Sequence, residues 1–400
     1  MAAETQDILA PRTVRRGPTI DSGPLSPGAL PPSRVMLLDL NWKQTPYVAA
    51  ALAASGIATT LITTLRPDHL GLGHYCTQIQ SPTPHSPDYL SFLRQQIATF
   101  RPDLLIPLCE PIMELLWDLD PQLEVPVYPP MTEELRSVLR DRRRFYERAA
   151  ALGIPVPPWM PIGSPADLVE AARQFGYPLV LRGTRGLAGS QVRVVSSAAQ
   201  ALVALGELNS ESPGQPFAQA FIKGPRHLVG GYFSRGEAIR LFAQETIHQH
   251  PAVTGPSIRV RACTDEALIQ STRALVSDLG WSGMACLEFI RDDHGRFVLM
   301  EMNPRPWAAL EVAERSGAGI CRAFAESLAG RPVGPLHGYR VGGSQVVLEG
   351  FLLARSPGTG VWPALKTLRP REWVDCLRAV PWGRPRLALH VLRRLYRELE

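Results

Sequence analysis

The feature that most constrains the fold is an alternation of strand-like and helix-like segments in the first quarter of the chain. The strand-like segments are short apolar runs, and the helix-like segments between them carry the period of an amphipathic helix. The apolar runs lie at residues 35–40, 57–63 and 103–108, and the helical patterns lie at residues 47–55 and 89–100. Strands that alternate with helices form βαβ units, so this segment predicts a parallel sheet.

Composition narrows the class of protein. A chain of 400 residues that is 45% hydrophobic and 20% charged is typical of a globular protein with two or three domains. A net charge of +5 suits polyphosphate ligands, but it does not indicate nucleic-acid binding. The six cysteines are scattered without metal-ligand spacing, which favours a reducing compartment. With no secretory signal and no transmembrane segment, we expect a soluble, cytoplasmic protein.

Helix-capping residues and glycines predict two helices and a strand in the middle of the chain. A helix is expected from Thr132 to just before Gly153. A second helix begins after Ser164, with a capping-box pattern, and stops at Gly176. The apolar residues 177–182 then predict a strand.

Two strand-like segments at residues 286–290 and 296–303 are joined by a predicted hairpin turn. A turn centred on the His–Gly pair before residue 296 places Glu288 directly opposite Glu301. Side chains of opposite residues point to the same face, and Asn303, two residues beyond Glu301, shares that face. The hairpin therefore predicts two carboxylates and one amide in a single cluster.

Two adjacent carboxylates repel each other unless a cation lies between them, and these oxygen ligands suit Mg²⁺ that also holds phosphates. The alternative is a solvated acidic sheet face, but the surrounding strands are strongly apolar. Arg305, between two prolines, is placed to hold phosphate or carboxylate oxygens beside this site.

A glycine-spaced loop follows the strand that ends at Arg182. Its glycines, Gly183, Gly186 and Gly189, would allow backbone N–H groups to approach phosphate oxygens, although a plain surface hairpin explains them equally well. Arg142 lies in a basic run that is expected late in the helix from Thr132, where the negative end of the helix dipole is a sufficient explanation. The loop after the first strand, around Lys43, is likewise either a ligand site or a simple connection.

The order of these motifs resembles the ATP-grasp superfamily, and specifically the synthetase units of the large subunit of carbamoyl-phosphate synthetase. The resemblance covers about residues 34–335. It implies an α/β (α+β ATP-grasp) fold in which a parallel α/β pre-ATP-grasp domain precedes a two-lobed ATP-grasp domain. The expected units are a tail at 1–33, the pre-ATP-grasp domain at 34–130, the ATP-grasp domain at 131–335 with its lid at about 159–225, and a helical extension at 336–400.

The resemblance also implies roles for individual residues. Arg142 and Arg182 would grip the phosphates of ATP, and Arg305 would steady the transferred phosphoryl group. The implied Mg²⁺ (or Mn²⁺) ligands are Glu288, Glu301 and Asn303, and the implied adenine hinge contains Gln219, Phe221 and Ile222.

Two positions depart from the family pattern. The hinge begins with Gln219 in place of the usual Glu. The Glu that usually holds the ribose is replaced by Arg226 or His227. These departures bear on nucleotide affinity and leave the predicted metal ligands unchanged.

The implied activity is that of an ATP-dependent ligase, which activates a small-molecule carboxylate as an acyl phosphate for attack by an amine or a similar nucleophile. The chain holds one synthetase unit, so carbamoyl phosphate is not the expected product. The alternatives are a sensing module that binds ATP without ligation, and an ATP-grasp phosphotransferase. A homodimer is compatible with the ligase activity.

The last stretch, residues 386–400, predicts an amphipathic basic helix. Such a helix packs against the core or, alternatively, contacts an acidic partner or a membrane surface.

Overall fold

The computed structural model describes most of the chain, and the findings below concern that part. The described residues are 30–40, 43–65, 72–119, 123–184, 191–211, 214–250, 255–334, 338–355, 366, 368–381, 385–386, 388–389 and 391–392. Most of the predicted tail, two glycines of the predicted phosphate loop (Gly186 and Gly189) and most of the predicted C-terminal helix lie outside these residues.

The first unit is a four-stranded parallel sheet, as the sequence predicts. Its strand order is β3-β2-β1-β4, and each of its pairings is parallel. The elements are β1 (Arg34–Asp39), α1 (Thr45–Ala54), β2 (Ala58–Thr63), β3 (Thr77–Gln80), α3 (Tyr89–Phe100), β4 (Leu104–Pro107) and α4 (Glu110–Leu119). The predicted α/β fold is therefore confirmed. Strand β3 was not predicted, because it is short and partly exposed and has no apolar run.

The central unit is a six-stranded antiparallel sheet in the order β13-β12-β9-β10-β11-β14. Its strands are β9 (Arg226–Ser234), β10 (Glu237–Gln249), β11 (Ser257–Cys263), β12 (Gly283–Arg291), β13 (Phe297–Asn303) and β14 (Gly342–Val346). Alternate residues of β12 enter two different cores. Leu287 and Phe289 pack in a cluster with helix α9 (Glu266–Asp278), whereas Met284 and Cys286 pack with helices α10 (Leu310–Arg315) and α11 (Ile320–Leu328).

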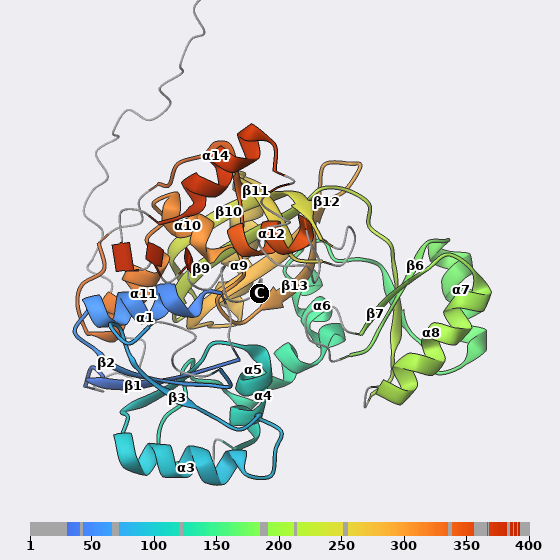
Figure 1. The fold of residues 1–400 in the computed structure, drawn as a ribbon. Coiled ribbons are helices and arrows are strands. Elements are labelled where there is room, and N and C mark those ends of the chain that lie inside the picture. The colour runs from blue at the N-terminus through green and yellow to red at the C-terminus, as the bar shows by residue number, and fades with distance from the viewer. Residues whose placement is uncertain are drawn as a thin grey trace, which may run out of the picture.

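A third, four-stranded sheet stands apart from the rest of the molecule, at the right of Figure 1. It has the order β5-β8-β6-β7, with a core shared with helices α7 and α8. The elements are β5 (Trp159–Pro161), α7 (Pro165–Phe175), β6 (Leu179–Arg182), β7 (Val192–Val195), α8 (Ala198–Glu211) and β8 (Phe217–Ala220). The predicted capping box of α7 forms between Ser164 and Asp167.

The prediction of a single helix from Thr132 is wrong, because Asp141 interrupts it and two helices form. Helix α5 (Glu133–Arg140) ends there, and α6 (Arg142–Ala151) begins with Arg142. Asp141 has an extended backbone, and its carboxylate accepts a hydrogen bond from the Arg143 amide at 2.9 Å, so it caps α6. Arg142 therefore lies at the positive end of a helix dipole, and the electrostatic explanation of the basic run does not apply to it.

The C-terminal part contains a strand as well as helices. Strand β14 adds to the central sheet beside β11, followed by α12 (Leu348–Arg355) and α14 (Pro370–Ala379). Helices α12 and α14 share a small core, against which Val391 packs. This contact agrees with the packed alternative for the predicted terminal helix. None of the helices within the described ranges is long and apolar enough to cross a membrane.

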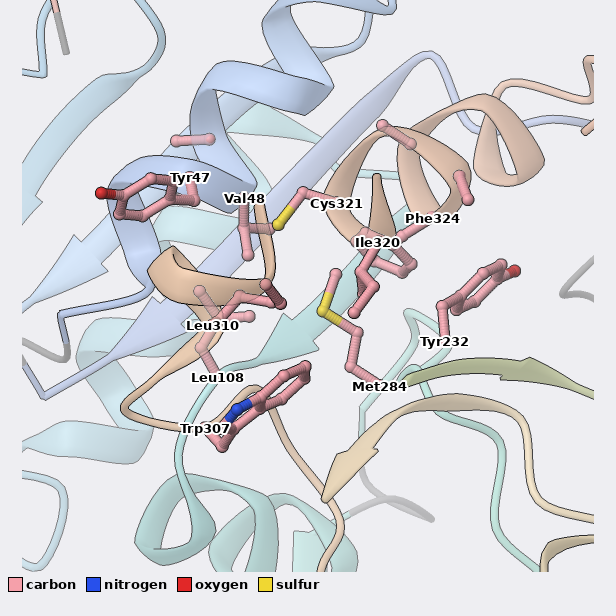
Figure 2. Packing of buried hydrophobic residues seen from close by; sticks show 14 of the residues in the cluster. Tyr47, Val48, Leu108, Tyr232, Met284, Trp307, Leu310, Ile320, Cys321 and Phe324 are labelled. Atoms are coloured by element: carbon pink, nitrogen blue, oxygen red, sulfur yellow. The ribbon is translucent and has the colours of Figure 1, made fainter. Parts of the chain in front are cut away.

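The largest core joins the first sheet to the central sheet, and Figure 2 shows its centre. Tyr47 and Val48 of α1 meet Ile320 and Cys321 of α11 there, so the two units share one continuous apolar contact. The six cysteines are free thiols, and five of them are buried.

Two glycines give a paired test of backbone conformation. Gly206 lies inside α8, and an added Cβ would meet nothing within 4 Å. Gly153 has a φ of +74° in the turn after α6. We expect Gly206→Ala to slow amide hydrogen exchange in α8 by about fivefold, because Ala is favoured over Gly by roughly 0.5–1 kcal/mol in a helix. Gly153→Ala, forced into a left-handed conformation, should instead lower the thermal midpoint; a higher midpoint would contradict this account.

Candidate active site

The predicted pairing of Glu288 with Glu301 is confirmed. The two residues are directly opposite in the β12–β13 ladder, and Asn303 lies opposite Cys286. The ladder is irregular next to this pair, because Phe289 pairs with Leu299 and leaves one residue of β13 as a bulge. The turn also lies one position away from the predicted one, and the two deviations compensate.

The two carboxylates and the amide form one cluster. The Asn303 Nδ2 atom lies 3.4 Å from Glu288 Oε1 and 3.3 Å from Glu301 Oε1, so the amide group donates to both carboxylates. All three side chains are only partly exposed. They lie on the sheet face that packs against α10 and α11, where the apolar pattern gives way to polar residues.

Two arginines from different parts of the chain share one oxygen of Glu301. Arg142 Nη1 lies 3.2 Å and Arg182 Nη2 lies 3.3 Å from Glu301 Oε2. Burial by itself would raise the pKa of Glu301, but the charges of Arg142 and Arg182 outweigh it and bring the pKa to about 2. Arg142 comes from α6 and Arg182 from the third sheet, so this carboxylate links the third sheet to the central one.

Glu288 has a cationic partner of its own, Arg226. Arg226 Nη1 lies 3.2 Å from Glu288 Oε2, and Arg226 Nη2 donates to the Gly255 carbonyl at 2.6 Å. Burial and the charge of Glu301 raise the pKa of Glu288 despite this partner. His227, the other residue at the expected ribose position, is buried with its ring edge-to-face against Phe297.

The cluster fits a divalent cation. The Asn303 NH₂ group, which carries partial positive charge, lies between two carboxylate oxygens that face each other. A flip of that amide would present its oxygen instead, giving three hard oxygen ligands of the kind that Mg²⁺ prefers. Among the residues that the structure describes, no group of three or more His, Cys, Asp or Glu forms an alternative metal site.

Arg305 lies beside this cluster, and it has an acidic partner that the sequence did not predict. Its Nη2 donates to Asn303 Oδ1 at 3.3 Å, and its Nε lies 3.4 Å from Glu110 Oε1. Glu110 is the first residue of α4, at the carboxyl edge of the parallel sheet. Burial raises the pKa of Glu110, and Arg305 opposes that effect. A buried strand followed by Glu and Pro was a signal that could have identified this residue.

The predicted hinge residue Gln219 is buried in β8. Its Oε1 accepts a hydrogen bond from the Tyr146 hydroxyl at 3.2 Å, and that hydroxyl also lies 2.9 Å from the Met300 carbonyl and 3.4 Å from Arg182 Nη1. Tyr146 thus connects the hinge to the arginine pair, and no motif indicated it. Phe221 and Ile222 follow directly, partly exposed.

The start of the predicted phosphate loop is tied to α6. Gly183 N donates to the Gln191 carbonyl at 3.1 Å, and Arg142 N donates to the Thr184 carbonyl at 3.2 Å. The two remaining predicted loop glycines, Gly186 and Gly189, lie outside the described residues. The part of the loop that is described therefore leads directly to the arginine pair.

A cleft that is open to solvent begins at this cluster. Arg142, Thr184, Glu301 and Asn303 form one end of it, and one face of α4 forms a wall. Trp307 does not line it, because its ring is buried in the core of Figure 2. Glu311 does not line it either: its carboxylate accepts a hydrogen bond from the Leu348 amide at 3.0 Å.

Comparison with known proteins agrees with this fold. Residues 141–320 match the family described as "Carbamoyl-phosphate synthase L chain, ATP binding domain". The carbamoyl phosphate synthase large chain of Thermomicrobium roseum is 26% identical over 219 residues, which cover 52% of this chain and 20% of that protein. The chain thus spans about a fifth of the length of this curated relative.

Solved structures show the same architecture. A biotin carboxylase from Campylobacter jejuni, described as a "beta-gamma-ATP" complex, superposes with a TM-score of 0.65 at 16% identity, covering 78% of this chain and 74% of that one. An L-amino acid ligase from Bacillus licheniformis gives a TM-score of 0.58 at 17% identity, covering 74% of each chain.

The chain has an ATP-grasp fold. Its residues 141–320 match the ATP-binding domain of the carbamoyl-phosphate synthase large chain, so the predicted resemblance is confirmed.

Proposed function

We propose that this protein is an ATP-dependent ligase that joins a small-molecule carboxylate to an amine, with ADP and phosphate as the other products. The observation that carries the proposal is the cluster in which Glu288, Glu301 and Asn303 converge beside four arginines. Such a set of oxygen ligands and guanidinium groups suits a metal-bound polyphosphate. The matched ATP-binding family and the ligase and carboxylase neighbours support the same reaction class.

Different residues have different roles in the proposed reaction. Arg142 and Arg182 hold the phosphates of ATP, and Gln219 with Phe221 and Ile222 holds the adenine. Glu288, Glu301 and Asn303 hold Mg²⁺ (or Mn²⁺), which offsets the negative charge of the phosphates when bound. Catalysis then rests on positioning and electrostatic stabilisation, and no covalent bond to the protein is required.

The proposed chemistry has two steps. A carboxylate oxygen of the substrate attacks the γ-phosphorus of ATP, the bond to ADP breaks, and an acyl phosphate forms. Arg305, 3.3 Å from Asn303 Oδ1, is placed to hold the transferred phosphoryl group. The amine nitrogen then attacks the acyl carbon, the C–N bond forms, and the bond to phosphate breaks as the nitrogen loses a proton to solvent or phosphate.

A trapping assay tests this proposal. The purified protein is incubated with ATP, Mg²⁺ and pools of carboxylic acids, with hydroxylamine as a nucleophile that converts acyl phosphates into hydroxamates. We expect ADP release and hydroxamate formation that both require an acid and both stop on addition of EDTA. Tight Mg-ATP binding without any ADP release would favour a sensing module. ADP release with a stable phosphorylated product and no hydroxamate would favour a phosphotransferase.

A further inference from the structure

Helix α14, the red helix at the top of Figure 1, presents apolar side chains to solvent. Trp373, Val374 and Leu377 are 40%, 42% and 52% exposed, whereas Cys376 and Ala379 of the same helix are buried in its core. Spacings of three and four residues place Leu377 beside both Val374 and Trp373, so the three side chains share one side of the helix, the outer face of α14. Contiguous apolar patches on a protein surface commonly mark a site of interaction.

The segment that follows α14 repeats this pattern. Its described residues, 385–386, 388–389 and 391–392, have a helical backbone. Ala388 and Val391 pack in the same small core as α14, whereas Leu389 and Leu392 are exposed. Five of the thirteen exposed large hydrophobic side chains of the described residues thus lie between residues 373 and 392. Such exposure is therefore concentrated in one short part of the chain and is not scattered singly over the surface.

The exposed charges beside the outer face are all positive. From residue 366 onward, the exposed charged side chains among the described residues are Lys366, Arg369, Arg371, Arg378 and Arg386. None of these five forms an ion pair with another residue that the structure describes. Their charges are therefore available to an anionic partner.

The two acidic residues of α14 do not offset these charges at the outer face. The Glu372 carboxylate accepts a hydrogen bond from the Arg369 amide at 2.9 Å and so caps the start of the helix. The Asp375 carboxylate pairs with Arg259 of the central sheet at 2.7 Å. Both carboxylates are engaged within the protein, so the outer face keeps its positive charge.

The distribution of charge along the sequence points the same way. Residues 366–400 contain nine Lys or Arg and four Asp or Glu, which gives a net charge of +5. The whole chain also has a net charge of +5, so residues 1–365 are neutral overall. The excess positive charge belongs to the segment that carries the exposed apolar side chains. That segment is therefore attracted to an anionic surface.

The arrangement on α14 suits the surface of an anionic lipid bilayer. Arg371, Val374 and Arg378 are spaced by three and four residues, so the two arginines border the apolar side chains. Trp373 and Leu377 would enter the boundary between headgroups and acyl chains, a level at which Trp is favoured. The arginines would extend their aliphatic stems and place their guanidinium groups on lipid phosphates.

Other occupants fit this face less well. A second copy of the chain, related by a two-fold axis, would bring the arginines of both copies together, and like charges at close range repel. An acidic protein would match the charges, but it would need pockets shaped to Trp373 and Leu377, which project from a convex helical surface. A fluid bilayer needs no such match.

We propose that the outer face of α14, where Arg371 and Arg378 border Trp373, Val374 and Leu377, binds the surface of an anionic lipid bilayer. The contact is peripheral, with the apolar side chains in the headgroup region and the helix lying along the surface. It uses none of the residues of the candidate active site, so it stands independently of the proposed ligase activity.

Sedimentation with lipid vesicles tests the proposal on the full chain. One set of vesicles contains equal amounts of phosphatidylglycerol and phosphatidylcholine, and the other contains phosphatidylcholine alone. We expect the partition coefficient for the anionic vesicles to be about tenfold or more higher, because cationic side chains near an anionic surface each add to the attraction. High salt should lower it, since salt screens that attraction. Equal binding to both sets, or binding to neither, would overturn the proposal.

Two variants locate the contact on α14. Trp373→Ser/Leu377→Ser removes apolar side chains, and Arg371→Gln/Arg378→Gln removes charges. Each should lower the partition coefficient for the anionic vesicles by about tenfold or more. All four side chains are exposed, so both variants should keep the thermal midpoint of the wild type. Binding that is unchanged in both variants would refute the assignment to α14.

Two control variants make the same kinds of change elsewhere on the surface. Val169→Ser/Val203→Ser alters exposed apolar side chains of α7 and α8. Arg173→Gln/Arg322→Gln removes two exposed arginines of α7 and α11. Both controls should partition as the wild type does. If they lose as much binding as the α14 variants, the contact is not specific to α14 and the proposal is wrong.

Two further results would assign the outer face to a different occupant and so overturn the membrane contact. Binding to polyglutamate without binding to anionic vesicles would indicate an acidic protein partner. A dimer in light scattering that Trp373→Ser/Leu377→Ser dissociates, with no vesicle binding by the wild type, would indicate a second copy. Vesicle binding is read without turnover, so failure of the hydroxamate assay would refute the ligase reaction and leave this proposal in place.

Discussion

Replacement of Glu301 by glutamine is expected to lower the rate of ATP turnover by about a thousandfold or more. The Glu301 carboxylate contacts Arg142, Arg182 and Asn303, and it is one of two proposed anionic metal ligands. Loss of a single charge-stabilising group at a reaction centre commonly lowers a rate by about 10²- to 10³-fold. Loss of a metal ligand adds to that effect, so we expect the rate to fall by about 10³-fold or more. Steady-state ADP release with the acid found by trapping measures it.

A matched variant separates this effect from general loss of charge. Glu245 lies in β10 of the same sheet and pairs with Arg261 at 3.6 Å, away from the cluster. Glu245→Gln should retain the wild-type rate. Circular dichroism should show that both variants are folded. Full activity of Glu301→Gln would remove the residue from the proposed active site.

The second large effect is expected from Gly230→Ala, which should lower the thermal midpoint by about 5 °C or more. A Cβ at Gly230 would lie 2.4 Å from two atoms of the Trp307 ring, closer than real contacts allow. Trp307 is 3% exposed and lies in the core between the first and central sheets, so its ring has little room to move (Figure 2). Overpacking of this kind commonly destabilises by about 1–3 kcal/mol.

A smaller side chain at position 307 should reverse part of this loss. Gly230→Ala combined with Trp307→Leu should be more stable than the sum of the two single effects predicts, because the added methyl group would occupy space that the ring vacates. Differential scanning calorimetry of the three variants gives the comparison. Strict additivity would mean that the clash is relieved elsewhere. Since Trp307 is two residues from Arg305, Gly230→Ala should also reduce ATP turnover.

Local sequence patterns predicted the parallel sheet and the Glu288–Glu301 pairing. The first follows from apolar runs whose period is clear, and the second from a hairpin with a recognisable turn. The pairing was correct even though the bulge beside Glu288 was not predicted, because the displaced turn compensated for it. A prediction of register can thus be right at one pair and wrong along the rest of a ladder.

The partners of the cluster could not be predicted in the same way. Glu110 is nearly two hundred positions from Arg305 along the chain, and only the packing of the first sheet on the central one brings them together. The break at Asp141 was missed because residues 140–144 contain no Gly or Pro, although Asp is a favoured capping residue. Tyr146 and Arg226 act through contacts between separate strands and helices, which no local motif records.

The shared oxygen of Glu301 has a consequence for how a nucleotide would bind. This carboxylate gathers Arg142 and Arg182 into one place, much as a phosphate would. The conformational entropy of two long side chains is therefore lost when the protein folds and does not have to be lost again on binding. A phosphate of the nucleotide would compete with the Glu301 carboxylate for these two guanidinium groups. A cation bound to that carboxylate would weaken its ion pairs with both arginines. In this arrangement the metal and the phosphates would bind cooperatively, because each would weaken the ion pairs between Glu301 and the two arginines that compete with the other.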